Sequence, residues 1–149
     1  MKTIKDLKQR LKEIEEEKVR LEKIIQEKTS ADIINKIKTF EDAFELLSDV
    51  EKKEFIKFCK HAKKHTIAFE KMVIIAKTLN EGWEPNWSNA NENKYYPRFN
   101  MNPFGFGVTF YVYWATDSIT GSRRCFKIRR LAEYAGKQFE DIYKEFMVL

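Results

Sequence analysis

The chain has 149 residues, of which 34% are charged and 43% hydrophobic, and its formal net charge is +5. This composition excludes intrinsic disorder and a disulfide-rich scaffold, and the length suffices for one domain with a core plus an appendage. The longest strictly apolar run, Met72–Ala76, is far too short to cross a bilayer. No apolar leader stands near the start. We therefore expect a cytoplasmic protein with no membrane contact, in a reducing compartment.

The segment at residues 3–28 has the pattern of a coiled-coil helix, without Gly or Pro and rich in Lys, Glu, Leu and Ile. Heptads counted from Ile4 place Lys18 and Lys28 at one a and one d position, and aliphatic residues at the others. These aliphatic residues, called the seam below, are Ile4, Leu7, Leu11, Ile14, Leu21 and Ile25. Because the stripe is narrow and the rest of the helix is charged, we expect it to lie against a partner along its length.

Three partners fit such a seam: another protein, a second copy of the chain in a homodimer, or the chain's own domain. The charges beside the seam leave the orientation of a pair open. In a parallel pair Arg10 would attract Glu15, whereas Glu17 would repel Glu22.

Two capping boxes mark helix starts in the next segment: Thr39 is followed by Asp42, and Ser48 by Glu51. The stretch after them is apolar almost all the way round, which indicates a buried central helix. Gly82 supplies a left-handed cap at its end.

The second half of the chain predicts a hairpin and a final helix. Residues 83–103 have the composition of an ordered but irregular loop. Residues 104–116 are rich in aromatic and β-branched side chains, and residues 122–128 alternate as a strand does. We predict that these two segments pair as an antiparallel hairpin around a turn at residues 117–121. Residues 129–146 follow as an amphipathic helix.

This order of elements predicts an α+β fold: a coiled-coil-like N-terminal helix, then a helical domain with a small antiparallel β-hairpin and a C-terminal helix. We divide the chain into the helix at residues 1–30 and a compact α+β domain at residues 31–149.

The cysteine and histidine side chains are the first candidates for chemistry. His61 and His65 have the spacing of two metal ligands, but the lysines around them oppose a cation and the His-Glu-x-x-His pattern is missing. Cys59 lies on a different helix face from His61, and Cys125 lies in a predicted strand. We expect inert buried thiols, no metal, no cofactor and no enzymatic activity.

Two groups of basic side chains could together bind phosphate groups of RNA or DNA. The first is a row on the helix after the second capping box, formed by Lys53, Lys57, Lys60 and Lys64. The second is the basic run Arg123, Arg124, Lys127, Arg129 and Arg130. The alternative is that both are ordinary solvated faces.

Aromatic residues are concentrated in one window, since eleven of the 21 lie between Trp83 and Trp114. Such side chains could stack on bases or anchor a protein partner. The alternative is a second small core beneath the loop and on the hairpin.

Several phrases of the sequence resemble, in order, a group of small accessory proteins encoded by phages and prophages. The phrases are AKTLNEGWEPNW at 76–87, KYYP at 94–97, GSRRCFK at 121–127 and LAEYAGKQF at 131–139. The likeness covers residues 39–149, so the N-terminal helix lies outside it. Arg124 stands where the resemblance implies an aliphatic residue.

The resemblance implies a setting, an accessory gene of a mobile element in the bacterial cytosol, and no activity. Small non-enzymatic proteins from such loci often inhibit host defence, as anti-CRISPR proteins do. Our first hypothesis is an interaction protein of this kind, which binds a host nuclease or its protein–RNA complex through residues 3–28 and the basic surfaces. The alternative is a nucleic-acid-binding accessory protein that uses the basic surface and the loop aromatics.

Overall fold

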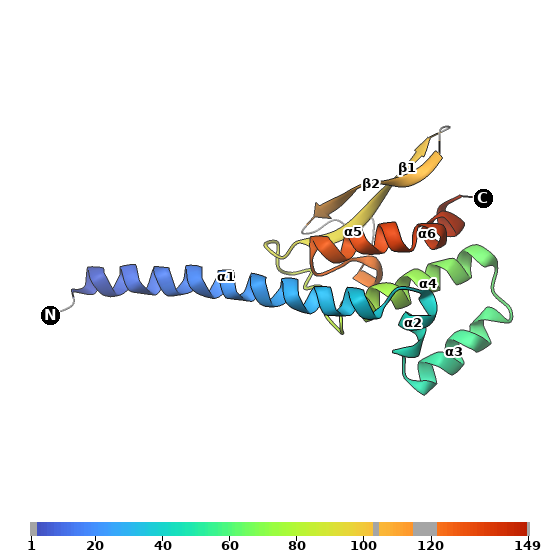
Figure 1. Cartoon of the computed structure of the whole chain (residues 1–149), viewed down its shortest axis with the longest axis horizontal. Coiled ribbons are helices and arrows are strands. Elements are labelled where there is room, and N and C mark those ends of the chain that lie inside the picture. Colours follow the sequence, from blue (N-terminus) through green and yellow to red (C-terminus); the bar gives the residue numbers. More distant parts are fainter. Residues whose placement is uncertain (1–2, 103–104, 115–121, 149) are drawn as a thin grey trace.

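The computed structural model describes residues 3–102, 105–114 and 122–148. It confirms the α+β class: a long N-terminal helix, a two-stranded antiparallel hairpin and C-terminal helices (Figure 1). The elements are α1 (Ile4–Lys36), α2 (Phe40–Glu45), α3 (Asp49–Cys59), α4 (Lys64–Leu79), β1 (Lys94–Asn102), β2 (Gly105–Trp114), η1 (Ser122–Arg124), α5 (Arg129–Gln138) and α6 (Glu140–Met147).

Helix α1 begins at a capping box, in which Thr3 and Asp6 cap each other's backbone amides. The predicted helix at residues 3–28 is present, and it continues without a break to Lys36. Residues 31–36, which we assigned to the compact domain, form the last turns of the same helix.

The root of α1 is fastened to α5 by side chains that reach backbone carbonyls. Arg130 donates from Nη1 to the carbonyl of Glu27 at 3.2 Å, and Gln138 donates from Nε2 to that of Lys38 at 2.8 Å. The Tyr134 hydroxyl donates to the carbonyl of Ile37. The rest of α1 extends away from the domain (Figure 1).

Helices α2 and α3 both begin at the predicted capping boxes, on Thr39 and Ser48. Helix α3 buries none of its residues completely. It is held by a cluster of phenyl rings, in which Phe55 lies 5.4 Å from Phe40 and 5.7 Å from Phe44 between ring centroids.

Helix α4 is the predicted central helix, and its residues Met72, Ile75 and Leu79 are completely buried. The chain leaves it through Glu81 at φ +52° and Gly82 at φ +81°, so the left-handed conformation predicted at Gly82 is present but begins one residue earlier. Asn80, just after α4, is buried and clamps a distant segment. Its Nδ2 donates to the carbonyl of Cys125 at 2.8 Å, and its Oδ1 accepts from the amide of Lys127 at 3.0 Å.

The hairpin is present, but the predicted strand pairing is wrong. Strand β2 pairs with β1, which occupies residues 94–102 of the predicted loop. The predicted strand at 122–128 is instead the 3-10 helix η1 followed by a single antiparallel bridge between Phe126 and Tyr95. The predicted turn at 117–121 lies outside the described residues.

Tertiary packing explains why β1 forms despite Pro97, a residue that usually argues against a strand. A two-stranded sheet has only edges, so the missing amide of Pro97 can face away from β2. After a bulge between Arg98 and Phe99, the Phe99 ring stacks on Phe106 at 4.8 Å and contacts Tyr143 of α6 at 4.8 Å. The strand is therefore fixed by contacts that no local pattern reveals.

The loop before β1 is wrapped around one buried cation. Lys94 is 1% exposed, and its ammonium donates to the carbonyls of Asn86 at 2.7 Å, Glu92 at 2.8 Å and Asn89 at 3.1 Å. The Trp87 ring lies 5.5 Å from the same ammonium. This explains how a loop with little apolar content is ordered.

The C-terminal segment is helical as predicted but is two helices rather than one. Phe139, with φ −114° and ψ 28°, breaks the helix between α5 and α6. Its ring is 4% exposed. The break therefore lies at a core residue.

Candidate interaction site

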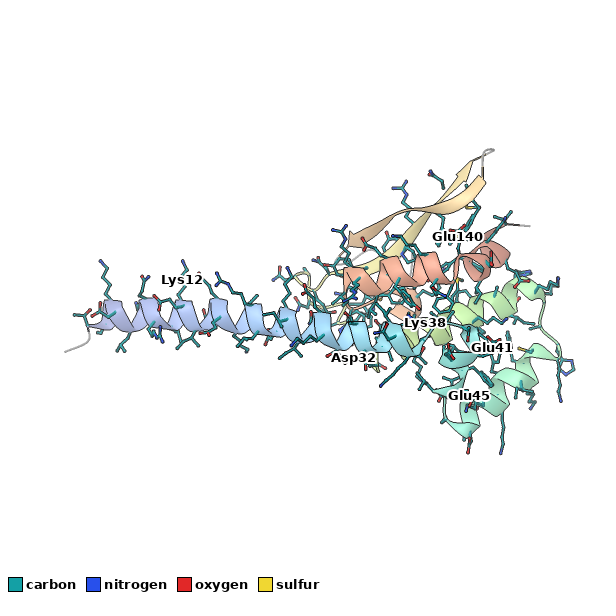
Figure 2. The ribbon with its side chains drawn as sticks, in the orientation of Figure 1. Lys12, Asp32, Lys38, Glu41, Glu45 and Glu140 are labelled. Atoms are coloured by element: carbon teal, nitrogen blue, oxygen red, sulfur yellow. The ribbon has the colours of Figure 1, made fainter. Side chains whose placement is uncertain are left out.

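The seam of α1 is exposed along its whole length. Every described residue from Thr3 to Lys28 is exposed, and seam residues range from 51% exposure at Ile14 to 75% at Ile4. Figure 2 shows Lys12 on this projecting part, with no other element beside it. The helix therefore does not fold back on its own domain, which removes one of the three partners that the sequence allows.

The domain contacts α1 at its root, beyond the last residue of the seam. Ser30, Ile33 and Ile37 are the buried residues of this root, whereas the seam ends at Ile25. A second helix could therefore lie along the seam ahead of the root without meeting the domain.

Ion pairs within the projecting part are all solvent-exposed. Examples are Lys12–Glu16 at 3.9 Å and Lys18–Glu22 at 3.8 Å, both four residues apart. Such pairs add only about 0.3–0.5 kcal/mol each. Most of the stability of a helix in a protein comes from packing of its apolar face, and here none of the residues that the structure describes packs on that face.

The lysine row predicted to bind phosphate is spread over two helices and the turn between them. Lys53 and Lys57 lie on α3, Lys60 follows it, and Lys64 is the first residue of α4. All four are exposed.

The basic run is largely engaged in contacts within the protein. Lys127 pairs with Glu81 at 3.2 Å, Arg129 pairs with Glu133 at 2.7 Å, and Arg130 holds α1 as described above. Arg129 and Arg130 are nevertheless exposed.

Arg124 enters an aromatic slot of the domain. Its guanidinium lies 5.2 Å from the ring of Phe69 and 5.6 Å from that of Phe146. Burial lowers the pKa of Arg124, which is opposed by the nearby Tyr143. The charge at this position, where the resemblance implies an aliphatic residue, is thus accommodated by stacking.

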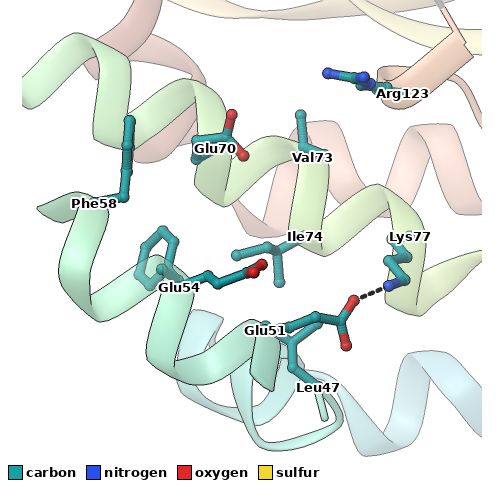
Figure 3. Close-up of a pocket in the computed structure, with 10 residues that line it drawn as sticks. Leu47, Glu51, Glu54, Phe58, Glu70, Val73, Ile74, Lys77 and Arg123 are labelled. Carbon is teal, nitrogen blue, oxygen red and sulfur yellow. Dashed lines mark hydrogen bonds and ion pairs between the residues drawn. The ribbon is translucent and has the colours of Figure 1, made fainter. Parts of the chain in front are cut away.

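A groove that the sequence analysis missed runs between α3 and α4. It has a volume of about 590 Å³ and is lined by phenyl and aliphatic groups together with charged side chains, and Figure 3 shows Phe58, Glu54 and Glu70 around it. A second hollow of about 510 Å³ adjoins it and shares Lys77 and Arg123. The groove arises from the packing of two helices, so no motif in the sequence marks it.

One carboxylate of this groove joins helices α3 and α4. Glu51 of α3 accepts a hydrogen bond from Lys77 of α4 (Figure 3). Lys77, followed by Ser48, lowers the pKa of Glu51 to about 2. Because Glu51 is ionised at neutral pH, it is suited to accept a hydrogen bond between the two helices and not to donate a proton.

The two histidines lie on different elements, whereas the predicted spacing of two metal ligands requires both on one helix. His61 lies in the turn after α3, whereas His65 lies in α4, and both are exposed. Among the described residues, no three His, Cys, Asp or Glu side chains gather as a metal site would require.

The two cysteines are free thiols in different environments. Cys125 is 1% exposed, and burial raises the pKa of its thiol to about 11, whereas Cys59 is only half-buried. The prediction of a buried thiol therefore holds for Cys125 and is only partly correct for Cys59.

In native protein at pH 8, we expect an aromatic disulfide reagent to modify Cys59 quickly and Cys125 only after unfolding. A thiol with a pKa near 11 has roughly 0.1% thiolate at this pH, and it is also shielded. The measurement is the rate of reagent release, with Cys59→Ser as the control that should abolish the fast phase. Two equally fast thiols per chain would contradict the described burial of Cys125.

Part of the aromatic window belongs to the core. Tyr95, Phe99 and Phe106 pack against the buried cluster, and Trp87 covers the ammonium of Lys94. Tyr95, Phe99 and Phe106 are thus buried in part, as the alternative predicts, but they join the main core rather than a second one.

No protein-family model, curated protein or solved structure matches this chain. None of the helices among the described residues combines the length and the apolar character needed to cross a bilayer. Packing within the domain does not account for the exposed apolar residues of the seam.

Proposed function

We propose that this protein is a non-enzymatic interaction protein whose projecting helix docks along its seam onto another polypeptide. The observation that carries this proposal is the exposure of all six seam residues on the part of α1 that projects from the chain's own domain. Exposed leucine or isoleucine is unremarkable singly, but a continuous stripe of them marks an interaction surface.

The energetics are sufficient for docking. Burying one exposed leucine or isoleucine contributes about 1.5–3 kcal/mol, so six can offset an association cost of about 4–15 kcal/mol. Lys18 and Lys28 interrupt the stripe, which lowers affinity while it fixes the register of a partner.

The class of partner rests on the resemblance to phage and prophage accessory proteins. That setting favours a protein of the bacterial host, or a protein–RNA complex, as the target of an anti-defence inhibitor. The internal engagement of Arg124, Lys127 and Arg130 argues against the basic run as a primary nucleic-acid surface, because counterion release requires cations that are free to meet phosphates.

The test is a seam variant with Leu11→Asp and Leu21→Asp. Both positions are exposed, at 59% and 53%, so the domain should keep its fold. Two carboxylates in a buried seam should weaken any association through it at least about 100-fold. The measurement compares binding by wild type and variant, in affinity capture from a bacterial host and in self-association.

The matched control carries Gln9→Asp and Lys23→Asp, at two f positions on the outer face of the same helix. Association that the control keeps and the seam variant loses supports the proposal. Association that all three proteins show equally, or none that the seam residues influence, would refute it.

A further inference from the structure

We infer that the seam binds a second copy of the chain in antiparallel orientation, with Leu11 of one copy opposite Ile14 of the other. This inference rests on the proposed function, because it names a second copy, in place of a host protein, as the polypeptide that docks along the same seam. It is carried by the distribution of charge along α1 and by the position of the domain.

The first half of the projecting helix consists of two blocks of opposite charge. The basic block contains Lys5, Lys8, Arg10 and Lys12, with Asp6 as its single acid. The acidic block that follows contains Glu13, Glu15, Glu16 and Glu17. An in-register parallel pair places the two basic blocks against each other and the two acidic blocks against each other. An antiparallel pair centred between Lys12 and Glu13 places the basic block of each copy against the acidic block of the other. By symmetry this contact forms twice.

The side chains that flank the seam agree with this arrangement. In an antiparallel pair, e positions face e positions and g positions face g positions. Lys8 then faces Glu15 of the second copy, and Arg10 faces Glu17. In the parallel pair, Glu17 faces Glu22 instead.

The interrupted seam positions give the same answer. A parallel pair places Lys18 against Lys18 and Lys28 against Lys28, two layers of like charge at the interface. In the antiparallel pair Lys18 lies opposite Leu7 of the second copy, and Lys28 lies beyond the overlap. A lysine stem can pack on leucine while its ammonium reaches water.

Charge also selects the register. Shifting the antiparallel pair by one heptad, so that Leu11 meets Leu21, gives the same number of wholly aliphatic layers. However, it places Glu15 against Glu15 and Glu17 against Glu17 at the centre. The register with Leu11 opposite Ile14 avoids both contacts.

The domain leaves room for this pair. It holds α1 through Ser30 and Ile33, which lie beyond the overlapping residues 4–21. The overlap spans about 27 Å at 1.5 Å per residue. The two domains would thus lie at opposite ends of a short rod, without contact with each other.

The first experiment is sedimentation equilibrium of the full chain from roughly 1 µM to 1 mM. We expect a transition from 17.8 kDa to twice that mass. Lys8→Glu reverses two symmetric pairs and should raise the dimer Kd about tenfold at low salt. Adding Glu15→Lys should restore the Kd to within about threefold of wild type, because the pairs are reformed with exchanged signs.

Lys23→Glu is the matched control, with the same change of charge at an f position outside the overlap, and it should leave the Kd unchanged. In a parallel dimer Lys8 would face Thr3, so Lys8→Glu would have little effect, and Glu15→Lys would weaken the dimer by breaking its pair with Arg10. That pattern would overturn the antiparallel inference.

Disulfide trapping provides an independent readout. In a Cys59→Ala background, with Cys125 kept because it is 1% exposed, single Leu11→Cys and Ile14→Cys variants should cross-link only when mixed. Cross-linking of Leu11→Cys with itself would indicate a parallel pair and refute the inference. A chain that stays at 17.8 kDa throughout would also refute it. The proposed function would still stand if the seam variant with aspartates then lost capture of a different partner.

Discussion

Replacing Phe126 by alanine is expected to lower the free energy of unfolding by about 3–5 kcal/mol. The ring is 0% exposed and belongs to the main core cluster. Its backbone is also paired in both directions with Tyr95, at 2.7 and 3.1 Å. The substitution leaves a large cavity beside a bridge that joins the hairpin to the segment before α5.

Urea or thermal unfolding followed by circular dichroism measures this loss. Phe58→Ala is the matched control, because Phe58 is only half-buried at the edge of the α3–α4 groove, and it should cost about 1–2 kcal/mol. Equal losses at the two positions would contradict the central place of Phe126 in the core.

Replacing Lys94 by methionine is expected to cost about 2–4 kcal/mol, because the volume of the stem is kept but the ammonium is lost. Three backbone carbonyls, those of Asn86, Asn89 and Glu92, would lose their charged donor. The ion pair with the Glu92 carboxylate at 3.3 Å would be lost as well. The loop that precedes β1 should then become open to proteases.

Two measurements separate this effect from a general loss of stability: the free energy of unfolding, and the rate of limited proteolysis within residues 83–93 under native conditions. Lys53→Met, at an exposed position of α3, should change either by little, within about 0.5 kcal/mol for stability. If Lys94→Met were as stable and as resistant as wild type, the buried ammonium would not be what orders the loop.

The compact domain and the projecting helix differ in whether they bury their own apolar side chains. The domain buries its own apolar groups around α4, whereas α1 exposes its seam and depends on a partner for most of its packing energy. An exposed stripe of this kind is costly to a protein unless association covers it. The helix and the domain can therefore be altered separately, which makes the seam variants informative.

Helix starts and the central helix could be predicted from the sequence because their causes are local. The capping boxes at Thr39 and Ser48 need only residues three positions apart, and Gly82 adopts the left-handed conformation in the turn after α4 through its own backbone freedom. The seam of α1 also follows from spacing alone.

Strand pairing could not be predicted in this way. Residues 122–128 alternate in the sequence, yet the adjacent residues Cys125 and Phe126 are both buried and Lys127 pairs with Glu81, so the segment does not have the two distinct faces of a strand. Strand β1 contains Pro97, and its contacts to Phe106 and Tyr143 come from distant parts of the chain. The sequence pattern of a segment indicates which of its residues are buried, but not which distant residues cover them.

The sequence by itself determined the α+β class, the helix caps and the apolar stripe of α1, because each depends on residues within a few positions of one another. Only the tertiary structure decided that the stripe stays exposed, that several cations of the basic run have partners within the protein, and that Lys94 lies inside a loop. The physical reason is that burial and ion pairing join residues such as Lys127 and Glu81, which are far apart in the chain.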